Sequence, residues 1–324
     1  MFNPRHLHIA LASDNNYIEF VAIVIVSLFA TNKKFEQITI HLLANDISVD
    51  NINKIKQHIP ENGELIIYSI NDISNRLKVK VSNTIAISAY ARLFLSSFIP
   101  KDIDKILYVD CDVVFNNDIT KLWKKNIAAY SIGGVLDTLP DYKAKELIGL
   151  KNNDAYVNSG VLLINLDYWR NNNIEQQFID FLLYHNGEIH HHDQGIINAV
   201  CKNRLILKPK YNLTSTYLSH PYWLLEKTNT PFYTQDVVKD AIVKPAIIHF
   251  TEGFYNRPWI SNSKHPMANV FRKYRNMTLW KNKPYRPDNR SIAVKTLSFF
   301  FLNTPYPCYN FISKIITILH KVIK

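Results

Sequence analysis

The amino-acid sequence predicts an α/β fold, and two observations carry this prediction. Short apolar runs rich in β-branched residues alternate with helical patterns, an order typical of parallel strands crossed by helices. The chain has 324 residues, of which 47% are hydrophobic, so it can bury one large core and carry a small appendage. This composition excludes a disordered chain, which combines low hydrophobicity with high charge.

The expected elements follow from the positions of these runs. We expect strands at residues 8–12, 38–43, 64–70, 105–109, 132–136, 161–166 and 246–250. We expect helices at residues 18–30, 49–58, 89–98, 174–184 and 194–202. Polar residues follow several of these strands, and open α/β sheets bind ligands beyond the carboxyl ends of their strands. Functional side chains are therefore expected in the loops that follow the strands.

The charge of the chain is distributed unevenly. The formal net charge is +11 at pH 7. No acidic residue follows Asp288, whereas the same stretch carries Arg290, Lys295, Lys314, Lys321 and Lys324. A basic excess at one end favours an anionic membrane surface as a partner, and nucleic acid is not expected.

Neither the cysteines nor the N-terminus indicates export. The three cysteines are widely separated and form no CxxC pair, which predicts neither a disulfide framework nor a cysteine-based zinc site. The first uncharged apolar run, residues 20–30, lies behind charged residues and is too short to span a bilayer. We therefore expect a cytoplasmic protein that lies peripherally on the inner face of the cell membrane.

The strongest local pattern is a hydrophobic strand that ends in two carboxylates, Asp110 and Asp112. Alternating strand geometry points both side chains to the same side, and burying a carboxylate there would be costly without a cation. Both can bind one hard divalent ion, Mg²⁺ or Mn²⁺, and through it a diphosphate. A turn that merely uses acidic residues is the alternative.

Six short segments then occur in a characteristic order and spacing. They are ASDNNY (12–17), AYARL (89–93), LYVDCD (107–112), VNSGVLLINL (157–166), HDQ (192–194) and IHF (248–250). Together they resemble the family 8 retaining glycosyltransferases, which include the LgtC-like bacterial lipooligosaccharide and polysaccharide glycosyltransferases. The resemblance covers roughly the first 260 residues. It implies a GT-A type fold, a Rossmann-like nucleotide-binding mixed sheet flanked by helices, with a small basic C-terminal appendage.

The resemblance also implies roles for individual residues. The positions that match the metal ligands are Asp110, Asp112 and His249, and two carboxylates with one imidazole suit Mn²⁺, with Mg²⁺ as the alternative. The positions that match the loop around uracil and ribose are Ala12, Asp14, Asn16 and Tyr17. The positions that match the lining of the donor-sugar site are Arg92, Asp137, Asn158, Asp193 and Gln194.

Several of these residues also have ordinary structural explanations. Without the resemblance, His249 reads as a core histidine and Arg92 as an ion-paired or snorkelling arginine. Residues 14–16 read as a polar turn, and residues 158–160 as the turn before a buried strand. These alternatives stay open at the level of sequence.

The chain departs from the family pattern after His249. Similar enzymes have the arrangement H-x-x-G-x-x-K-P-W, whereas this chain has HFTEGFYNRPW at residues 249–259. The loop is two residues longer, and Arg257 replaces lysine. Arginine can still bind a diphosphate, even with two parallel hydrogen bonds. We therefore expect Gly253 and Arg257 to contact phosphate.

The resemblance implies transfer of a hexose, galactose or glucose, from a UDP-sugar to a hydroxyl of a glycan or glycolipid acceptor, such as lipooligosaccharide core. Retention conventionally uses a carboxylate nucleophile, but the matching position is Gln194, whose amide is a poor nucleophile. We therefore expect front-face attack, with Gln194 and Asp193 stabilising the cationic sugar. The alternatives are another metal-dependent nucleotide enzyme, such as a nucleotidyltransferase or phosphohydrolase, and a non-catalytic peripheral membrane protein.

We expect three segments: a catalytic domain (1–260), an irregular connecting segment (261–290) and a basic amphipathic tail (291–324). From Phe311 onward the polar positions form one stripe on a helix, opposite a wide apolar face. Such a helix is typical of one that lies on an anionic leaflet. A helix packed on the catalytic domain would show the same pattern and is the alternative.

Overall fold

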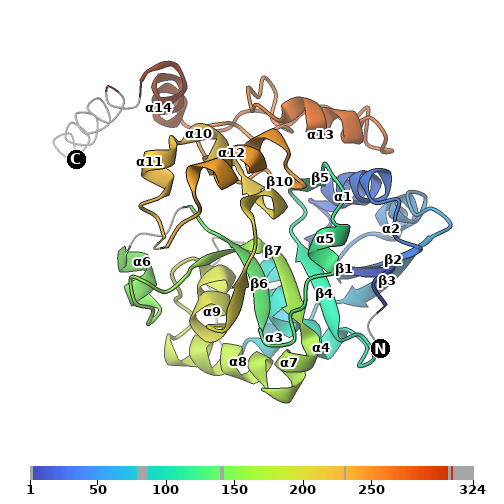
Figure 1. The fold of residues 1–324 in the computed structure, drawn as a ribbon. Coiled ribbons are helices and arrows are strands. Elements are labelled where there is room, and N and C mark those ends of the chain that lie inside the picture. Colours follow the sequence, from blue (N-terminus) through green and yellow to red (C-terminus); the bar gives the residue numbers. More distant parts are fainter. Residues whose placement is uncertain (1–2, 79–86, 139–141, 230, 306–307, 309–324) are drawn as a thin grey trace.

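The computed structural model describes the whole chain except residues 1–2, 79–86, 139–141, 230, 306–307 and 309–324. Within that part, seven strands form a mixed sheet and three form a smaller one (Figure 1). The large sheet has the spatial order β3 (Gly63–Ser69), β2 (Gln37–Asn45), β1 (His6–Asp14), β4 (Lys105–Val109), β7 (Val157–Asn165), β6 (Ile132–Leu136) and β8 (Arg204–Ile206). The small sheet has the order β5 (Val113–Phe115), β10 (Ile247–His249) and β9 (Leu213–Thr214). The α/β prediction is confirmed.

The direction of β7 decides where its polar residues lie. Strands β3, β2, β1 and β4 are parallel, whereas β7 is antiparallel to both of its neighbours, β4 and β6. In this register Val161 pairs with Val109, so β7 begins at the edge of the sheet where β4 ends. Residues 158–160 belong to the strand itself. The alternative of a turn before the strand is therefore wrong, whereas the expectation of a mixed sheet is confirmed.

Helices pack against both faces of the large sheet. The longer ones in the described part are α1 (Ile18–Thr31), α2 (Val49–Lys56), α8 (Ile174–Tyr184), α9 (His192–Val200), α12 (Gln235–Val243), α13 (Ala268–Arg275) and α14 (Ile292–Asn303). The shorter ones are α3 (Ile73–Arg76), α4 (Leu95–Phe98), α5 (Thr120–Trp123), α6 (Tyr142–Leu147), α7 (Leu166–Asn171), α10 (Ser215–Ser219), α11 (Tyr222–Leu225) and the 3₁₀ helices η1 (Ile87–Phe94) and η2 (Pro209–Tyr211). The helix expected at residues 89–98 is thus the 3₁₀ helix η1 followed by the single α-helical turn of α4.

Alternation along the strands of the large sheet places one hydrophobic core on each of its two faces. Leu107 and Val109 of β4 face the core that contains α1, whereas Ile106 and Tyr108 face the core that contains residues of α7, α8 and α9. This division follows from the pleat, which points successive side chains to opposite faces. Helix α1 is buried nearly all round, which explains why its sequence is almost uniformly apolar.

The segment 261–290 is not wholly irregular as expected, because it contains α13. Phe271 and Tyr274 of α13 lie in the same core as α1. Farther along, Lys283 Nζ lies 3.1 Å and Arg286 Nη2 2.8 Å from the carboxylate of Glu19 at the start of α1. Apolar burial and these ion pairs therefore hold the segment against α1.

Helix α14 also contacts the domain. Its Phe301 is 8% exposed, and its ring stacks on Phe254 with centroids 3.6 Å apart, beside His220 at 5.1 Å. Through Phe301, this part of the tail therefore packs against the loop that contains Phe254. The lysine stripe expected from Phe311 lies outside the described residues. Among the described helices, none has the length and apolar character needed to cross a bilayer.

Candidate active site

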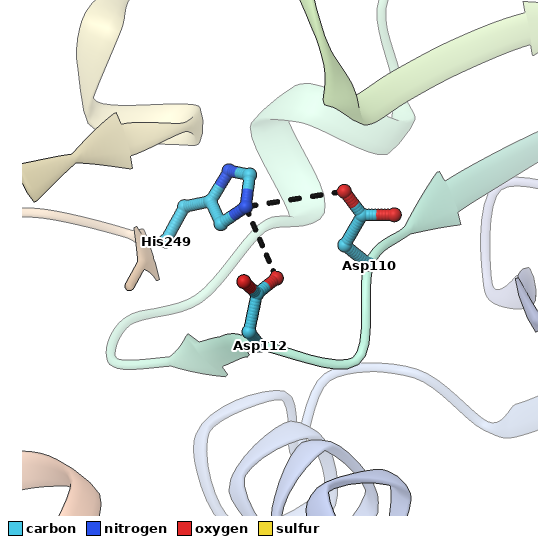
Figure 2. A group of neighbouring side chains, drawn as sticks. All are labelled: Asp110, Asp112 and His249. Atoms are coloured by element: carbon cyan, nitrogen blue, oxygen red, sulfur yellow. Dashed lines mark ion pairs between the residues drawn. The ribbon is translucent and has the colours of Figure 1, made fainter. Parts of the chain in front are cut away.

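The two sheets meet at the segment that carries the paired carboxylates. Asp110 follows β4, and Asp112 precedes β5. Strand β5 pairs antiparallel with β10, where His249 lies opposite Val113, and the Phe250 backbone N–H donates to the Asp112 carbonyl at 2.9 Å. This ladder brings a histidine from late in the sequence beside both carboxylates (Figure 2).

Asp110, Asp112 and His249 form a candidate metal centre. His249 Nε2 lies 3.1 Å from Asp112 Oδ1 and 3.9 Å from Asp110 Oδ2. The three potential ligand atoms lie within 4.8 Å of one another, so small shifts would bring them around one ion. Two carboxylates and an imidazole fit Mn²⁺, which accepts oxygen and nitrogen ligands.

The electrostatics of this cluster favour a cation. Burial lowers the pKa of His249, but the adjacent Asp112 and Asp110 carboxylates outweigh burial and raise it overall. Burial raises the pKa of Asp112, but His249 and Arg257 outweigh burial and lower it overall. The ring thus attracts a proton because it faces two negative groups. A divalent ion at the same place would neutralise the two carboxylates more completely than a single proton on the ring does.

Arg92 is a buried cation between two aspartates. Its Nη2 donates to Asp110 Oδ1 at 2.7 Å, and its Nε lies 3.0 Å from Asp193 Oδ2. Its Nη1 donates to the Ser159 carbonyl at 2.9 Å, and its guanidinium carbon lies 4.5 Å from the Tyr108 ring centre. Burial lowers the pKa of Arg92, but the two carboxylates raise it overall. Arg92 is therefore ion-paired and also orients a candidate metal ligand.

A second polar cluster joins Asp137, Asn158 and Gln194. Gln194 Nε2 donates to Asp137 Oδ2 at 2.8 Å, and Gln194 Oε1 accepts from Asn158 Nδ2 at 3.1 Å and from the Ser159 backbone N–H at 3.0 Å. Asp193 is apart from this cluster, because its carboxylate pairs with Arg92. Burial raises the pKa of Asp193 despite that cation.

A cavity of about 180 Å³ lies beside the candidate metal ligands. Its lining contains seven of the residues expected at the site, Ala12, Asp14, Tyr17, Arg92, Asp110, Asp112 and Arg257, together with Ser13, Ser88, Ala89, Tyr108 and Cys111. The Asp14 carboxylate accepts backbone N–H groups of its own loop, from Asn16 at 2.8 Å and Tyr17 at 3.1 Å. Asp14 thus shapes the loop, as the turn alternative expected, and also borders the cavity.

The loop at residues 249–259, which differs from the family pattern, contains the two expected phosphate contacts. Only one of them, Arg257, lies at the cavity. Arg257 lines the cavity, with Nη2 3.8 Å from Asp112 Oδ2. Its buried Nε has no hydrogen-bond partner in the part of the chain that the structure describes. Gly253 is exposed and is not among the residues that line the cavity.

Comparison with known proteins assigns the chain to a family. The family described as Glycosyl transferase family 8 matches residues 8–263. The chain belongs to this family. The earlier resemblance is thereby confirmed, and the match ends near the predicted end of the catalytic domain.

Several relatives of this family 8 chain span most of its length. General stress protein A of Bacillus subtilis is 28% identical over 278 residues, or 85% of this chain and 94% of that protein. A lipopolysaccharide 1,2-glucosyltransferase of Escherichia coli is 28% identical over 280 residues, or 84% of this chain and 79% of that protein. The galactosyltransferase LgtC, solved with donor and acceptor sugar analogues, has a TM-score of 0.70 at 23% identity and covers 86% of this chain and 100% of its own. The LgtC likeness confirms the GT-A fold.

Sequence reasoning missed two structural contributors to the family 8 site. Gly160 was noted only as part of a motif, yet a Cβ there would lie 2.2 Å from His249 Cε1 and 2.8 Å from Asp110 Oδ2. Asn212 was not noted at all, although its Oδ1 lies 2.9 Å from His249 Nδ1. No local pattern marks Asn212, because its importance depends on the pairing of distant strands.

Gly160→Ala is expected to weaken Mn²⁺ binding by at least about tenfold, because the added methyl group displaces His249 or Asp110. The measurement is the signal of free Mn²⁺ in electron paramagnetic resonance titrations. Gly133→Ala is the control, since a Cβ there meets its nearest neighbour, Leu207 Cδ2, only at 3.4 Å. Equal Mn²⁺ affinity in the two variants would contradict a close fit around Gly160.

Proposed function

We propose that this family 8 glycosyltransferase is a retaining, Mn²⁺-dependent hexosyltransferase that uses a UDP-sugar donor. The proposal rests on the cluster of Asp110, Asp112 and His249, which lies beside a cavity lined by residues of the 12–17 loop. An ion held by these three residues would stabilise the negative charge that develops on the leaving diphosphate. Galactose or glucose is favoured because relatives include lipopolysaccharide glucosyltransferases and a lipopolysaccharide 1,3-galactosyltransferase.

Arg257 is proposed to bind the diphosphate together with the ion. Its guanidinium lines the cavity, and its buried Nε lacks a hydrogen-bond partner among the described residues. A planar guanidinium matches the geometry of phosphate oxygens. The exposed position of Gly253 gives no comparable support for a phosphate contact. Of the two phosphate contacts expected in residues 249–259, we therefore retain Arg257.

The reaction that fits these side chains is front-face substitution at the anomeric carbon. The bond from that carbon to the diphosphate oxygen breaks, the acceptor hydroxyl oxygen forms the new bond on the same face, and its proton passes to the departing oxygen. Gln194 supports this course, because both ends of its amide are held by Asp137, Asn158 and Ser159. It can stabilise positive charge on the sugar but is a poor nucleophile.

Asp193 is proposed to act through Arg92 and not by direct attack on the sugar. Its side chain is 9% exposed and lies 3.0 Å from Arg92 Nε. Arg92 in turn holds Asp110, so the charge of Asp193 helps to keep a candidate metal ligand in place. This arrangement supports electrostatic and positioning roles for both residues of the Asp193–Gln194 pair.

Asp110→Asn and Asp112→Asn are each expected to lower UDP-sugar turnover by at least about 100-fold, because each removes a formal charge from the proposed metal site. The change is isosteric, so both variants should fold, although Asp110→Asn should lower the thermal unfolding temperature because it leaves Asp193 as the one carboxylate that still compensates the buried Arg92. Asp104→Asn, which alters an exposed aspartate before β4, is the control and should keep full turnover. Wild-type turnover in both variants at limiting Mn²⁺ would show that the metal assignment is wrong.

Gln194→Ala is expected to lower turnover by roughly 10- to 1,000-fold while leaving measurable activity, since an electrostatic helper contributes less than an obligate nucleophile. Single-turnover rates with a UDP-sugar measure the effect. Intact-protein mass spectrometry of the wild-type enzyme during turnover should detect no covalent sugar. A sugar attached to any side chain would require a different mechanism.

The tail beyond α14 is proposed to attach the enzyme to an anionic membrane on the cytoplasmic face, where it would modify a surface glycan. The sequence pattern from Phe311 supports this proposal. A chain ending at residue 304 keeps the Phe301–Phe254 contact and should keep UDP-sugar hydrolysis.

The shortened chain should lose binding to vesicles that contain anionic lipid. Replacing Lys314, Lys321 and Lys324 by Glu should weaken binding of the full chain as much as high salt does, since each basic residue contributes about 1 kcal/mol near such a surface. Co-sedimentation with vesicles measures both effects. Equal binding by the full and the shortened chain would contradict the proposal.

A further inference from the structure

Asn212 connects the candidate metal centre to the polar cluster around Gln194. It is fully buried between η2 and β9. On one side, its Oδ1 lies 2.9 Å from His249 Nδ1. On the other, its Nδ2 donates to Asn158 Oδ1 at 2.8 Å. One buried amide therefore contacts a candidate metal ligand and a residue of the second cluster.

The orientation of these amides follows from a backbone group that can only donate. The Gly160 N–H lies 3.0 Å from Asn158 Oδ1, so that atom must be the oxygen of Asn158. The group of Asn212 that faces the same oxygen must then be its NH₂. The Asn212 oxygen is consequently the atom directed at His249. Gly160 thus sets the direction of the whole hydrogen-bond chain.

This direction determines the tautomer of His249. Because Asn212 Oδ1 can only accept, Nδ1 of the ring must carry the hydrogen. In the neutral ring, Nε2 then has a free lone pair. That nitrogen is the one that faces Asp112 at 3.1 Å and Asp110 at 3.9 Å. Figure 2 shows it directed toward both carboxylates.

We propose that Asn212 is a positioning residue with two separable effects. Its oxygen fixes the ring and tautomer of His249, so that Nε2 is presented to a divalent ion. Its NH₂ orients Asn158, whose Nδ2 donates to Gln194 Oε1 at 3.1 Å and to Asp137 Oδ2 at 3.2 Å. Ion binding and the donor-sugar side of the site are thereby connected through one side chain. The inference rests on the proposed metal centre.

Two substitutions separate the effects. Asn212→Ala removes both bonds and is expected to raise the Mn²⁺ dissociation constant by about 10- to 100-fold. Asn212→Asp keeps an acceptor for the His249 Nδ1–H but loses the donor to Asn158. We expect it to hold the Mn²⁺ dissociation constant within about threefold of wild type while lowering kcat or raising KM for the UDP-sugar by about tenfold or more.

Asn165→Ala is the matched control. Asn165 is also a buried asparagine that donates from Nδ2, to the Ile127 carbonyl at 3.0 Å, and accepts at Oδ1, from the Tyr168 N–H at 2.9 Å. It lies at the opposite end of β7 from Asn158. Its loss should lower stability without changing Mn²⁺ affinity. Equal Mn²⁺ affinity in folded Asn212→Ala and in wild type would overturn the proposal.

A spectroscopic readout on the wild-type protein does not depend on activity. In ¹⁵N-labelled metal-free protein at a pH where the ring is neutral, long-range ¹H–¹⁵N correlations should show His249 with the hydrogen on Nδ1. The His249→Gln variant identifies the signal. A ring with the hydrogen on Nε2 would refute the inference even if Mn²⁺ binds. If wild type bound no divalent ion yet showed the Nδ1–H ring, the proposed metal-dependent function would fail and the positioning by Asn212 would stand.

Discussion

Arg92 ties four separate parts of the chain to one edge of the large sheet. It extends from η1 to Asp110 after β4, to the Ser159 carbonyl in β7 and to Asp193 in α9. A buried guanidinium is tolerated only when its charge is compensated and its donors are bonded, and here two carboxylates and two carbonyls do both. The geometry of the candidate metal centre therefore depends on the positively charged guanidinium of Arg92.

Much of the fold could be predicted from the sequence, because the pattern of apolar and polar residues reflects which side chains are buried. The strands at residues 105–109 and 132–136 agree with β4 and β6, and the helix at 174–184 agrees with α8. The direction of β7 could not be read from its residues, since a strand buried on both faces shows the same apolar run in either direction. The 3₁₀ geometry of η1 was also missed, since apolar residues three positions apart share a face in both a 3₁₀ and an α-helix.

The residues of the candidate site, too, could be predicted only in part from the sequence. Asp110 and Asp112 were identified from local chemistry, because two carboxylates after an apolar strand require an explanation. His249 was identified only through the family resemblance, and Asn212 was missed entirely. Both depend on the small sheet, in which β10 pairs with β5 and β9. Sequence spacing contains no information on such pairing between distant segments.

The link between β5 and β10 has a consequence for the order of events during synthesis. Asp112 and His249 are adjacent in space but more than a hundred residues apart in the chain. A ribosome would release the two carboxylates long before the histidine, so the growing polypeptide would present an incomplete site. Ion capture would await the last strand of the small sheet, and once bound the ion would close a large loop and resist its reopening. Metal supply would thus affect the maturation of the enzyme as well as its turnover.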